Sequence, residues 1–415
     1  MKQFKMAMAG MLVIVGLGRT GMAQTSMAPT NAPQAVAPAQ KSWADSVKLT
    51  GDVRYRYETI KDDSKLGTDK QPFTEQRNRI RARIGAEGKC DDLTVGIGIA
   101  TATGAAGSGN PVSLNDTLGT GESMKSIFLN YAYMDYNCFG ENPDGELHAV
   151  AGKMKNPFNT MIGSASLDDL IWDPNVTPEG VALKGQIGND FAKLYANAGY
   201  IWVQERATGN SYGDDSMLYA GQAGVKLTFI PEVALTFGGS YYDFTHLQGM
   251  DLIDYQTPAS AYGNSTKAGS VSGTTTNKAW ASQFTPVVCF AQLDLWIAGL
   301  PMSLFGQTLH NTDCTTSFDN GSVYGARLGK AKNPHTWELG YSYEQLDADA
   351  TPGLLADSDR WGGGTDGKGH EIYGKYQFMK NLQGVVTYYM DKKTISVASK
   401  TVDYDRLQVD LVASF

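Results

Sequence analysis

The chain has 415 residues and a formal net charge of −8, and only 19% of its residues are charged. This acidic balance disfavours nucleic-acid binding, because phosphate contacts need a basic surface. The 47 glycines and 21 tyrosines, with no amphipathic segment longer than two helical turns, favour an all-β fold over a helical enzyme or a helical membrane protein.

The N-terminus predicts an exported protein. Two lysines precede an apolar run at 6–18, and small residues that suit a signal peptidase follow it. The run is shorter than the about 20 apolar residues that a membrane-spanning helix needs. We expect a signal peptide over 1–23, a disordered leader rich in alanine and proline over 24–42, and one barrel domain over 43–415.

Segments with apolar residues at every second position recur through this domain, as in strands with two different faces. Each is long enough to cross a bilayer at the usual strand tilt, and short connections alternate with long ones. We therefore predict an antiparallel transmembrane β-barrel of about sixteen strands, with short periplasmic turns and long external loops. The segments lie at 47–58, 74–87, 91–101, 123–137, 144–153, 179–187, 190–204, 215–228, 233–243, 284–298, 302–312, 321–329, 334–346, 369–378, 381–391 and 402–415.

The last segment shows the alternation clearly. Val409, Leu411 and Phe415 share one face, whereas Asp410 and Ser414 share the other. The first face suits lipid and the second suits an aqueous lumen. A soluble sandwich explains any single strand equally well, but the repetition of the pattern along the chain favours the barrel.

Arginines line one face of the second predicted strand, opposite Ile80, Ala82 and Ile84. An arginine facing hydrocarbon costs some 2–4 kcal/mol at the membrane midplane, so this face is expected to line the lumen. The first strand adds two arginines next to Asp52 and Glu58. The alternative is a solvated strand face paired with acidic neighbours. The predicted pore-lining arginines are Arg54, Arg56, Arg77, Arg79, Arg81 and Arg83.

The third long connection, 154–178, contains apolar residues that are unusual in a loop exposed to water, among them Leu170 and Trp172. We expect this loop to fold inward against the barrel wall; an external lid is the alternative. Its carboxylates would then face the arginines and set the ion preference. The predicted pore-lining carboxylates are Asp168, Asp169, Asp173 and Glu179.

The four cysteines show no Cys-x-x-Cys spacing, so disulfides are favoured over a zinc site in an exported chain. From their positions on the predicted strands we expect the bonds Cys90–Cys138 and Cys289–Cys314, with the second pairing depending on an uncertain register.

Sequence signatures of enzymes and cofactor sites are missing. The five histidines are scattered, and no Gly-x-Ser-x-Gly motif occurs. Gly96 and Gly98 lack the third glycine of a dinucleotide-binding loop and fall within a predicted strand. We expect neither an enzyme, nor a cofactor, nor a metal site.

Four motifs resemble the putative porins of Gram-negative bacteria. They are the stretches at 48–58, at 77–83, at 152–158 (Gly-Lys-Met-Lys-Asn-Pro-Phe) and at 172–180 (Trp-Asp-Pro-Asn-Val-Thr-Pro-Glu-Gly). The resemblance extends from about residue 43 to the end, and later strands match only in pattern. It implies an outer-membrane diffusion channel and says little about the solute.

The sequence therefore predicts an outer-membrane porin for passive diffusion of small hydrophilic solutes and ions, with a weak preference for anions. A selective phosphate or carboxylate channel and a secreted carbohydrate-binding β-protein are the alternatives. The expected partners are outer-membrane lipid and lipopolysaccharide, the barrel-assembly machinery, and the solutes themselves. A homotrimer is left open, and no nucleic acid is expected.

Overall fold

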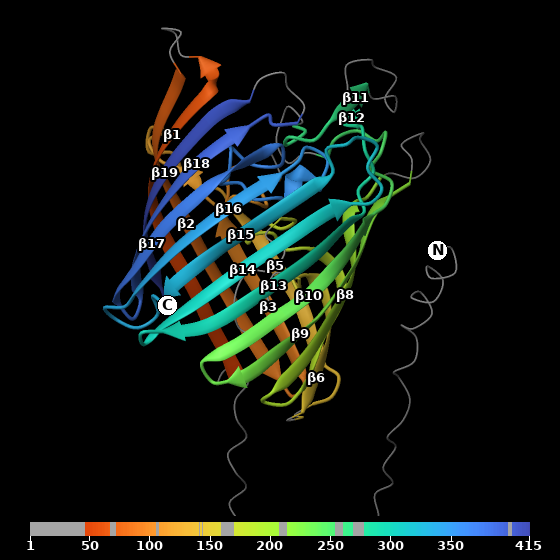
Figure 1. The fold of residues 1–415 in the computed structure, drawn as a ribbon, viewed down its shortest axis with the longest axis vertical. Helices are drawn as coiled ribbons and strands as arrows, with labels where there is room; N and C mark the ends of the chain where they lie inside the picture. The colour runs from red at the N-terminus through yellow and green to blue at the C-terminus, as the bar shows by residue number, and fades with distance from the viewer. Residues whose placement is uncertain are drawn as a thin grey trace, which may run out of the picture. The chain divides into compact units, whose positions relative to one another are not determined.

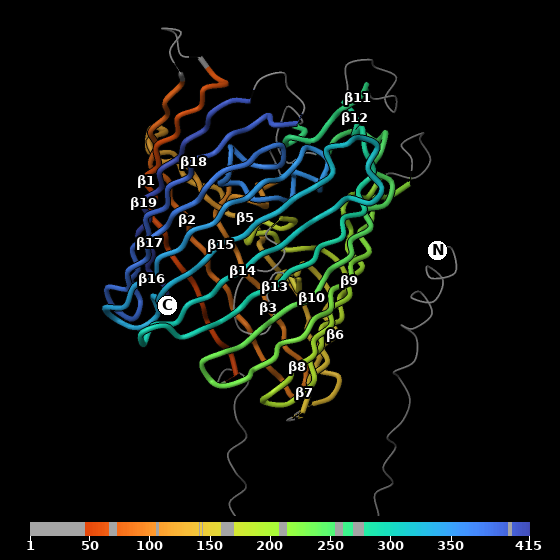
Figure 2. The backbone as a smooth tube through the Cα atoms, in the orientation of Figure 1, coloured from red at the N-terminus to blue at the C-terminus, as the bar shows by residue number. Residues whose placement is uncertain are grey.

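Strict alternation of side-chain faces produces long strands, and each of these pairs with two neighbours until the sheet closes on itself. In the computed structural model, sixteen antiparallel strands formed by the described residues make a closed ring in which β1 pairs with both β2 and β19. Figures 1 and 2 show these strands wrapped into a barrel. The barrel strands are β1 (Val47–Leu66), β2 (Pro72–Cys90), β3 (Leu93–Thr101), β5 (Ile127–Asn137), β6 (Gly145–Lys153), β7 (Glu179–Gly188), β8 (Ala192–Gln204), β9 (Ser216–Ile230), β10 (Val233–Phe244), β13 (Pro286–Ile297), β14 (Leu300–Asn311), β15 (Asn320–Gly329), β16 (Trp337–Leu346), β17 (Gly367–Met379), β18 (Leu382–Lys393) and β19 (Val402–Ser414).

The structure describes most of the barrel but not the N-terminus. The described residues are 46–66, 72–104, 108–140, 142, 144–158, 170–206, 214–253, 260–268, 278–396 and 401–415. The predicted signal peptide and leader lie outside them. Within these residues, no helix is long and apolar enough to cross a membrane.

Short elements lie in the long connections. They are β4 (Asp116–Thr117), which pairs with β2, the hairpin of β11 (Thr266–Ala268) and β12 (Lys278–Trp280), and the 3-10 helix η2 (Gly353–Leu355). None of these was predicted, because elements of two or three residues carry no periodic pattern.

Each of the sixteen predicted strands is confirmed, and the first two are longer than predicted. Pairing between β1 and β2 continues past residue 58, with Ile60 opposite Glu75 and Asp62 opposite Phe73. The predicted strand ends at residue 58. The strand continues instead, because its inward side meets charged partners such as Lys393, which donates to Asp62.

The two faces of the strands differ as predicted. On β18, Val386 and Tyr388 are exposed whereas Thr387 and Asp391 are buried. Because the sheet is closed, the exposed apolar side chains form its outer surface and the buried polar ones point inward. The outer surface therefore suits lipid, and the polar lumen lies inside.

Closure of the barrel depends on the C-terminus. The backbone N–H of Phe415 donates to the Gly51 carbonyl at 3.0 Å, and the Gly51 N–H donates to the Phe415 carbonyl at 3.1 Å. A Cβ at Gly51 would lie 2.3 Å from the Phe415 ring, so only glycine fits beneath this ring. The aromatic terminus therefore locks β19 against β1.

The four cysteines are free thiols, so both predicted disulfides are corrected. Leu93 of β3 pairs with Cys90 on one side and with Tyr136 on the other, so β3 separates Cys90 from Cys138. Two strand spacings amount to roughly 9.5 Å, more than a disulfide reaches.

The second predicted bond fails because of the register. Cys289 lies opposite Thr308, six residues before Cys314 in the chain. Cys314 follows the end of β14, and its Sγ contacts the Ser282 hydroxyl at 3.6 Å instead.

Deleting Phe415 should sharply reduce the amount of folded protein in the outer membrane, because it removes both the closing hydrogen bonds and the ring over Gly51. Heat-dependent migration on an SDS gel measures the folded fraction. Phe229→Ala removes another exposed aromatic ring and should leave that fraction nearly unchanged. Normal levels of heat-modifiable protein without Phe415 would contradict the role of the terminus in closure.

Candidate functional site

The inward faces of three neighbouring strands, β19, β1 and β2, form one charged surface. The register places Arg54 opposite Arg81 and Arg56 opposite Arg79. Directly opposed like charges destabilise a sheet unless carboxylates lie between them. We call this surface the basic wall. Its arginines are Arg54, Arg56, Arg77, Arg79, Arg81, Arg83 and Arg406.

Two aspartates separate the arginines of the wall. Asp52 Oδ1 accepts from Arg81 Nη2 at 2.7 Å, and its Oδ2 accepts from Arg83 Nε at 2.6 Å. Asp410 accepts from Arg56 through Nε at 2.7 Å and through Nη2 at 2.8 Å. Such a two-point contact fixes the orientation of the guanidinium as well as its charge.

Glu58 is the central carboxylate of the basic wall and is fully buried. Arg406 Nη2 lies 2.5 Å from Glu58 Oε2, and Arg79 Nη1 lies 3.4 Å from Oε1, which also contacts Arg77. Removing one partner from a buried ion pair typically costs roughly 3–5 kcal/mol, because the other charge stays buried without compensation. Glu58 therefore holds three strands together.

An acidic surface lies beside the basic wall on β16, β17 and β18. Glu344 and Asp391 are buried there, and Glu371 is their neighbour on β17. Lys375 of β17 pairs with Glu338 of β16 at 3.0 Å. We call Glu338, Glu344, Glu371 and Asp391 the acidic face. The inner wall thus carries opposite charge on adjacent groups of strands.

The loop at 347–366 connects the two surfaces through consecutive residues of opposite charge. Asp359 lies 3.2 Å from Arg56 Nη1 and 3.0 Å from Arg406 Nη2. The next residue, Arg360, lies 3.5 Å from Glu371 and 3.4 Å from Asp391. The pair therefore binds the loop to both the basic wall and the acidic face.

The charges of the wall decide the ionisation of this loop. Burial by itself raises the pKa of Asp359, but the charges of Arg406, Arg56 and Arg54 outweigh it and hold the pKa below its usual value. Asp359 is therefore an anion at working pH.

The sequence did not single out Asp359, Arg360 or Arg406. An isolated Asp-Arg pair in a long loop is common, and nothing local shows which strands supply its partners, one of which, Arg56, lies 303 residues earlier in the chain. The run of aromatic and glycine residues that follows it, Trp361 to Gly364, was the only available signal of a packed loop.

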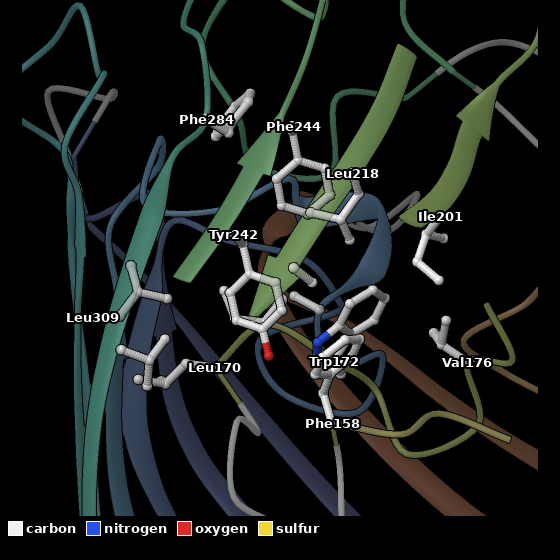
Figure 3. Packing of buried hydrophobic residues seen from close by; sticks show 14 of the residues in the cluster. Phe158, Leu170, Trp172, Val176, Ile201, Leu218, Tyr242, Phe244, Phe284 and Leu309 are labelled. Carbon is white, nitrogen blue, oxygen red and sulfur yellow. The ribbon is translucent and has the colours of Figure 1, made fainter. Parts of the chain in front are cut away.

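The third loop, of which residues 154–158 and 170–178 are described, packs against inward-facing side chains over 170–172. Leu170, Ile171 and Trp172 are almost completely buried. Figure 3 shows Trp172 beside Phe158 and Tyr242, with ring centroids 6.4 and 6.0 Å away. Apolar contact therefore holds this segment in place.

Asp173 does not face an arginine, contrary to the prediction. Its Oδ2 accepts from the Ser358 N–H at 3.0 Å, and its backbone N–H donates to the Leu355 carbonyl at 2.7 Å. Asp173 therefore joins the third loop to the 347–366 loop.

Burial raises the pKa of Asp173 to about 7. Burial and the charges of Asp359 and Asp173 likewise raise the pKa of Asp357.

The other predicted carboxylates have different outcomes. Asp168 and Asp169 lie outside the described residues. Glu179 lies opposite Trp202 of β8, whose side chain is exposed on the outer surface. Glu179 is therefore on the outward face and pairs there with Lys153 at 2.9 Å, so its assignment to the pore lining is corrected. The prediction treated Glu179 as a carboxylate of the loop, but it is the first residue of β7, and the alternation of that strand directs its side chain outward.

The connection between β3 and β5 contacts the basic wall. Asn115 accepts from Arg54 Nη2 at 2.6 Å through its side chain and from Arg79 Nη2 at 3.2 Å through its backbone carbonyl. The Val112 carbonyl accepts from Ser358 Oγ at 2.9 Å and from Asn175 Nδ2 at 3.1 Å. Three long connections thus meet in front of the basic wall.

Comparison with known proteins agrees with this geometry. The model of the family described as "Putative porin" matches residues 67–276 and 305–415. The chain belongs to this family. It is an outer-membrane porin, a channel for passive diffusion. Family membership also favours the channel over a secreted carbohydrate-binding protein.

Solved structures are similar in fold. The high-pH structure of OprB from Pseudomonas putida has 14% identity and a TM-score of 0.55, covering 89% of this chain and 94% of that one. Outer-membrane expressed OmpT of Vibrio cholerae has 12% identity and a TM-score of 0.47, covering 89% and 97%. At these identities the likeness concerns the fold alone. No curated protein sequence matches the chain.

The contact between the two loops of this porin should strengthen at acidic pH. The native state holds a proton on Asp173 between its ordinary pKa of 3.8 and about 7, where the unfolded chain has released it. The free energy of unfolding therefore falls as pH rises through this window. We expect a higher thermal midpoint at pH 5 than at pH 8, measured by gel mobility after heating.

Asp173→Asn together with Asp357→Asn should remove most of this pH dependence, because an amide has no proton to lose in this range. Asp91→Asn, on an exposed turn, is the matched control and should keep the parental difference. The same pH dependence in the double variant as in the parent would show that these carboxylates do not control it.

Proposed function

We propose that this porin passes small anionic solutes somewhat more readily than cations of the same size. The supporting observation is the excess of guanidinium groups on the basic wall. Among the described residues, its seven arginines meet five carboxylates: Asp52, Glu58, Glu75, Asp359 and Asp410. The wall therefore carries net positive charge even though the whole chain is acidic.

Arginines that stay partly exposed make this charge available to a solute. Arg83 keeps 37% of its side chain exposed and Arg77 keeps 25%. An anion in the lumen gains interactions that the five carboxylates leave unsatisfied, whereas a cation is repelled.

The mechanism is passive. The three connections in front of the wall narrow the lumen, so size is limited by their packing. The charge of the wall acts over a short distance, because ions screen it within about 8 Å at physiological salt. In a passage narrower than this, the charged groups that line it govern ion preference. The net charge of the whole chain, −8, has less influence.

A channel selective for phosphate or carboxylate solutes is the second candidate. It is favoured by the planar, fixed guanidinium groups, which match the geometry of both anions. Saturation of the current by such a solute at millimolar concentration would distinguish it from a general porin.

The remaining assignments follow from the outer-membrane barrel. We propose for the porin an export signal over residues 1–23, insertion by the barrel-assembly machinery and contacts with lipopolysaccharide. The charged residues of the site bind and steer ions rather than catalyse a reaction, and no enzymatic activity is proposed.

Replacing Arg79 and Arg81 by Ser should shift the selectivity toward cations, because it removes two positive charges from the middle of the wall. Reversal potentials across a planar bilayer in a tenfold salt gradient measure the shift. Lys330→Ser with Lys332→Ser makes the same charge change on a turn between β15 and β16 and should have little effect. Gel mobility verifies that each variant is folded.

The reciprocal change is Asp359→Asn, which removes the loop carboxylate that neutralises Arg56 and Arg406. It should strengthen the anion preference. If the reversal potential is the same in the parent, the double arginine variant and Asp359→Asn, neither group acts on the conducting path and the proposed preference is wrong.

A further inference from the structure

The barrel wall has a notch between β5 and β8. Ala132 of β5 pairs with Lys153, the last residue of β6, and Lys153 pairs with Glu179, the first residue of β7. β5 nevertheless extends five residues beyond Ala132, from Ile127, and none of these five pairs with a described residue on the β6 side. At about 3.3 Å per residue, the unpaired edge is roughly 17 Å long.

The end of the third loop, at Thr177, fills the bottom of this notch. Thr177 Oγ1 donates to the Asn130 carbonyl of β5 at 2.6 Å. Lys153 Nζ donates to the Thr177 carbonyl at 3.1 Å. These bonds satisfy part of the exposed backbone edge and fix the lower margin of the opening.

A cavity of about 590 Å³ occupies the notch above these bonds. Leu129 and Trp202, which line it, are exposed on the outer surface of the barrel. Trp172 and Leu218, which also line it, are buried inside the barrel, as Figure 3 shows. The cavity therefore passes through the wall and joins the membrane side to the packed interior.

The opening lies at the level of an aromatic belt. The rings of Tyr200 and Trp202 on β8 are 5.5 Å apart, and those of Tyr200 and Tyr219 on β9 are 5.2 Å apart. Aromatic side chains gather on the outside of membrane barrels where the hydrocarbon meets the polar head groups. The mouth of the cavity is therefore in contact with lipid.

We propose that this cavity binds one hydrocarbon chain that enters from the membrane. Its volume is within the range of small-molecule sites, and most of the residues that line it are apolar, among them Leu114, Phe128 and Leu218. Lys153 and Glu179 lie at the outer margin, where they face the polar end of an amphipathic molecule.

Trp172 provides the measurement, because it lines the cavity and is only 2% exposed. The test uses the full chain with Trp43, Trp202, Trp296 and Trp337 changed to Phe, which leaves Trp172 and the buried Trp280 and Trp361. The protein is placed in bilayers of ordinary phospholipid, in bilayers of phospholipid brominated on the acyl chain, or in ordinary bilayers with added brominated fatty acid.

Bromine in the cavity should remove most of the emission that Trp172 contributes. The loss should disappear in Trp172→Phe, because Trp280 and Trp361 do not line the cavity. Val203→Phe fills the cavity and should reduce the loss, whereas Val385→Phe, a matched change on the inner face of β18, should not. Quenching in brominated phospholipid identifies a lipid acyl chain as the source, and quenching only by the fatty acid identifies a free amphiphile.

Either of these results supports the site. The proposal is overturned if neither brominated probe lowers the Trp172 emission in protein that is folded by gel mobility. It is also overturned if Val203→Phe and Val385→Phe reduce the quenching equally. The measurement does not involve conductance, so it is independent of the proposed ion preference.

Discussion

Buried ion pairing across the seam of the barrel is the interaction on which the lumen depends. β1 and β19 are far apart in the sequence, and their inward faces carry Arg54, Arg56 and Arg406 next to one another. Without Glu58 and Asp410 this seam would bring like charges together in a region with little water. The carboxylates convert a repulsive surface into a network of ion pairs. The same ion pairs therefore close the barrel and form its charged lumen.

The same network explains why the loops lie where they do. The basic wall retains more positive charge than its own strands neutralise, and the acidic face retains negative charge. A loop that carries Asp359 and Arg360 side by side compensates both. Trp172 and its neighbours give the third loop an apolar contact, and Asp173 ties it to the 347–366 loop. The interior is therefore organised by matching charge at the wall and by apolar packing above it.

The inward course of the third loop shortens the strands on either side of it. The chain leaves β6 at Lys153 to enter the barrel and returns at Glu179, so β6 and β7 are shorter than the strands on either side. A closed sheet cannot lose strand length without exposing an edge. Thr177 compensates for part of that edge, and the remaining gap is the cavity behind Leu129 and Trp202. The inward course of the chain and the opening toward the membrane are thus two results of the same strand ends.

The sequence by itself determined the barrel, its sixteen strands and the inward direction of the arginines. These properties are local. In a strand, alternate residues point to opposite faces, and an arginine on the lipid-facing side costs too much free energy. What only the tertiary structure decided is which charges meet. Asp359, Arg360 and Arg406 escaped prediction because their partners lie on other strands, and two of the contacts, Asp359 with Arg56 and Arg406 with Glu58, join residues more than 300 positions apart. Glu179 was misplaced because it was assigned to the loop rather than to the strand that it begins. The cysteines were misplaced because an intervening strand separates one pair and the register separates the other. Periodicity fixes the direction of a side chain, whereas the register and the course of the loops fix its neighbours.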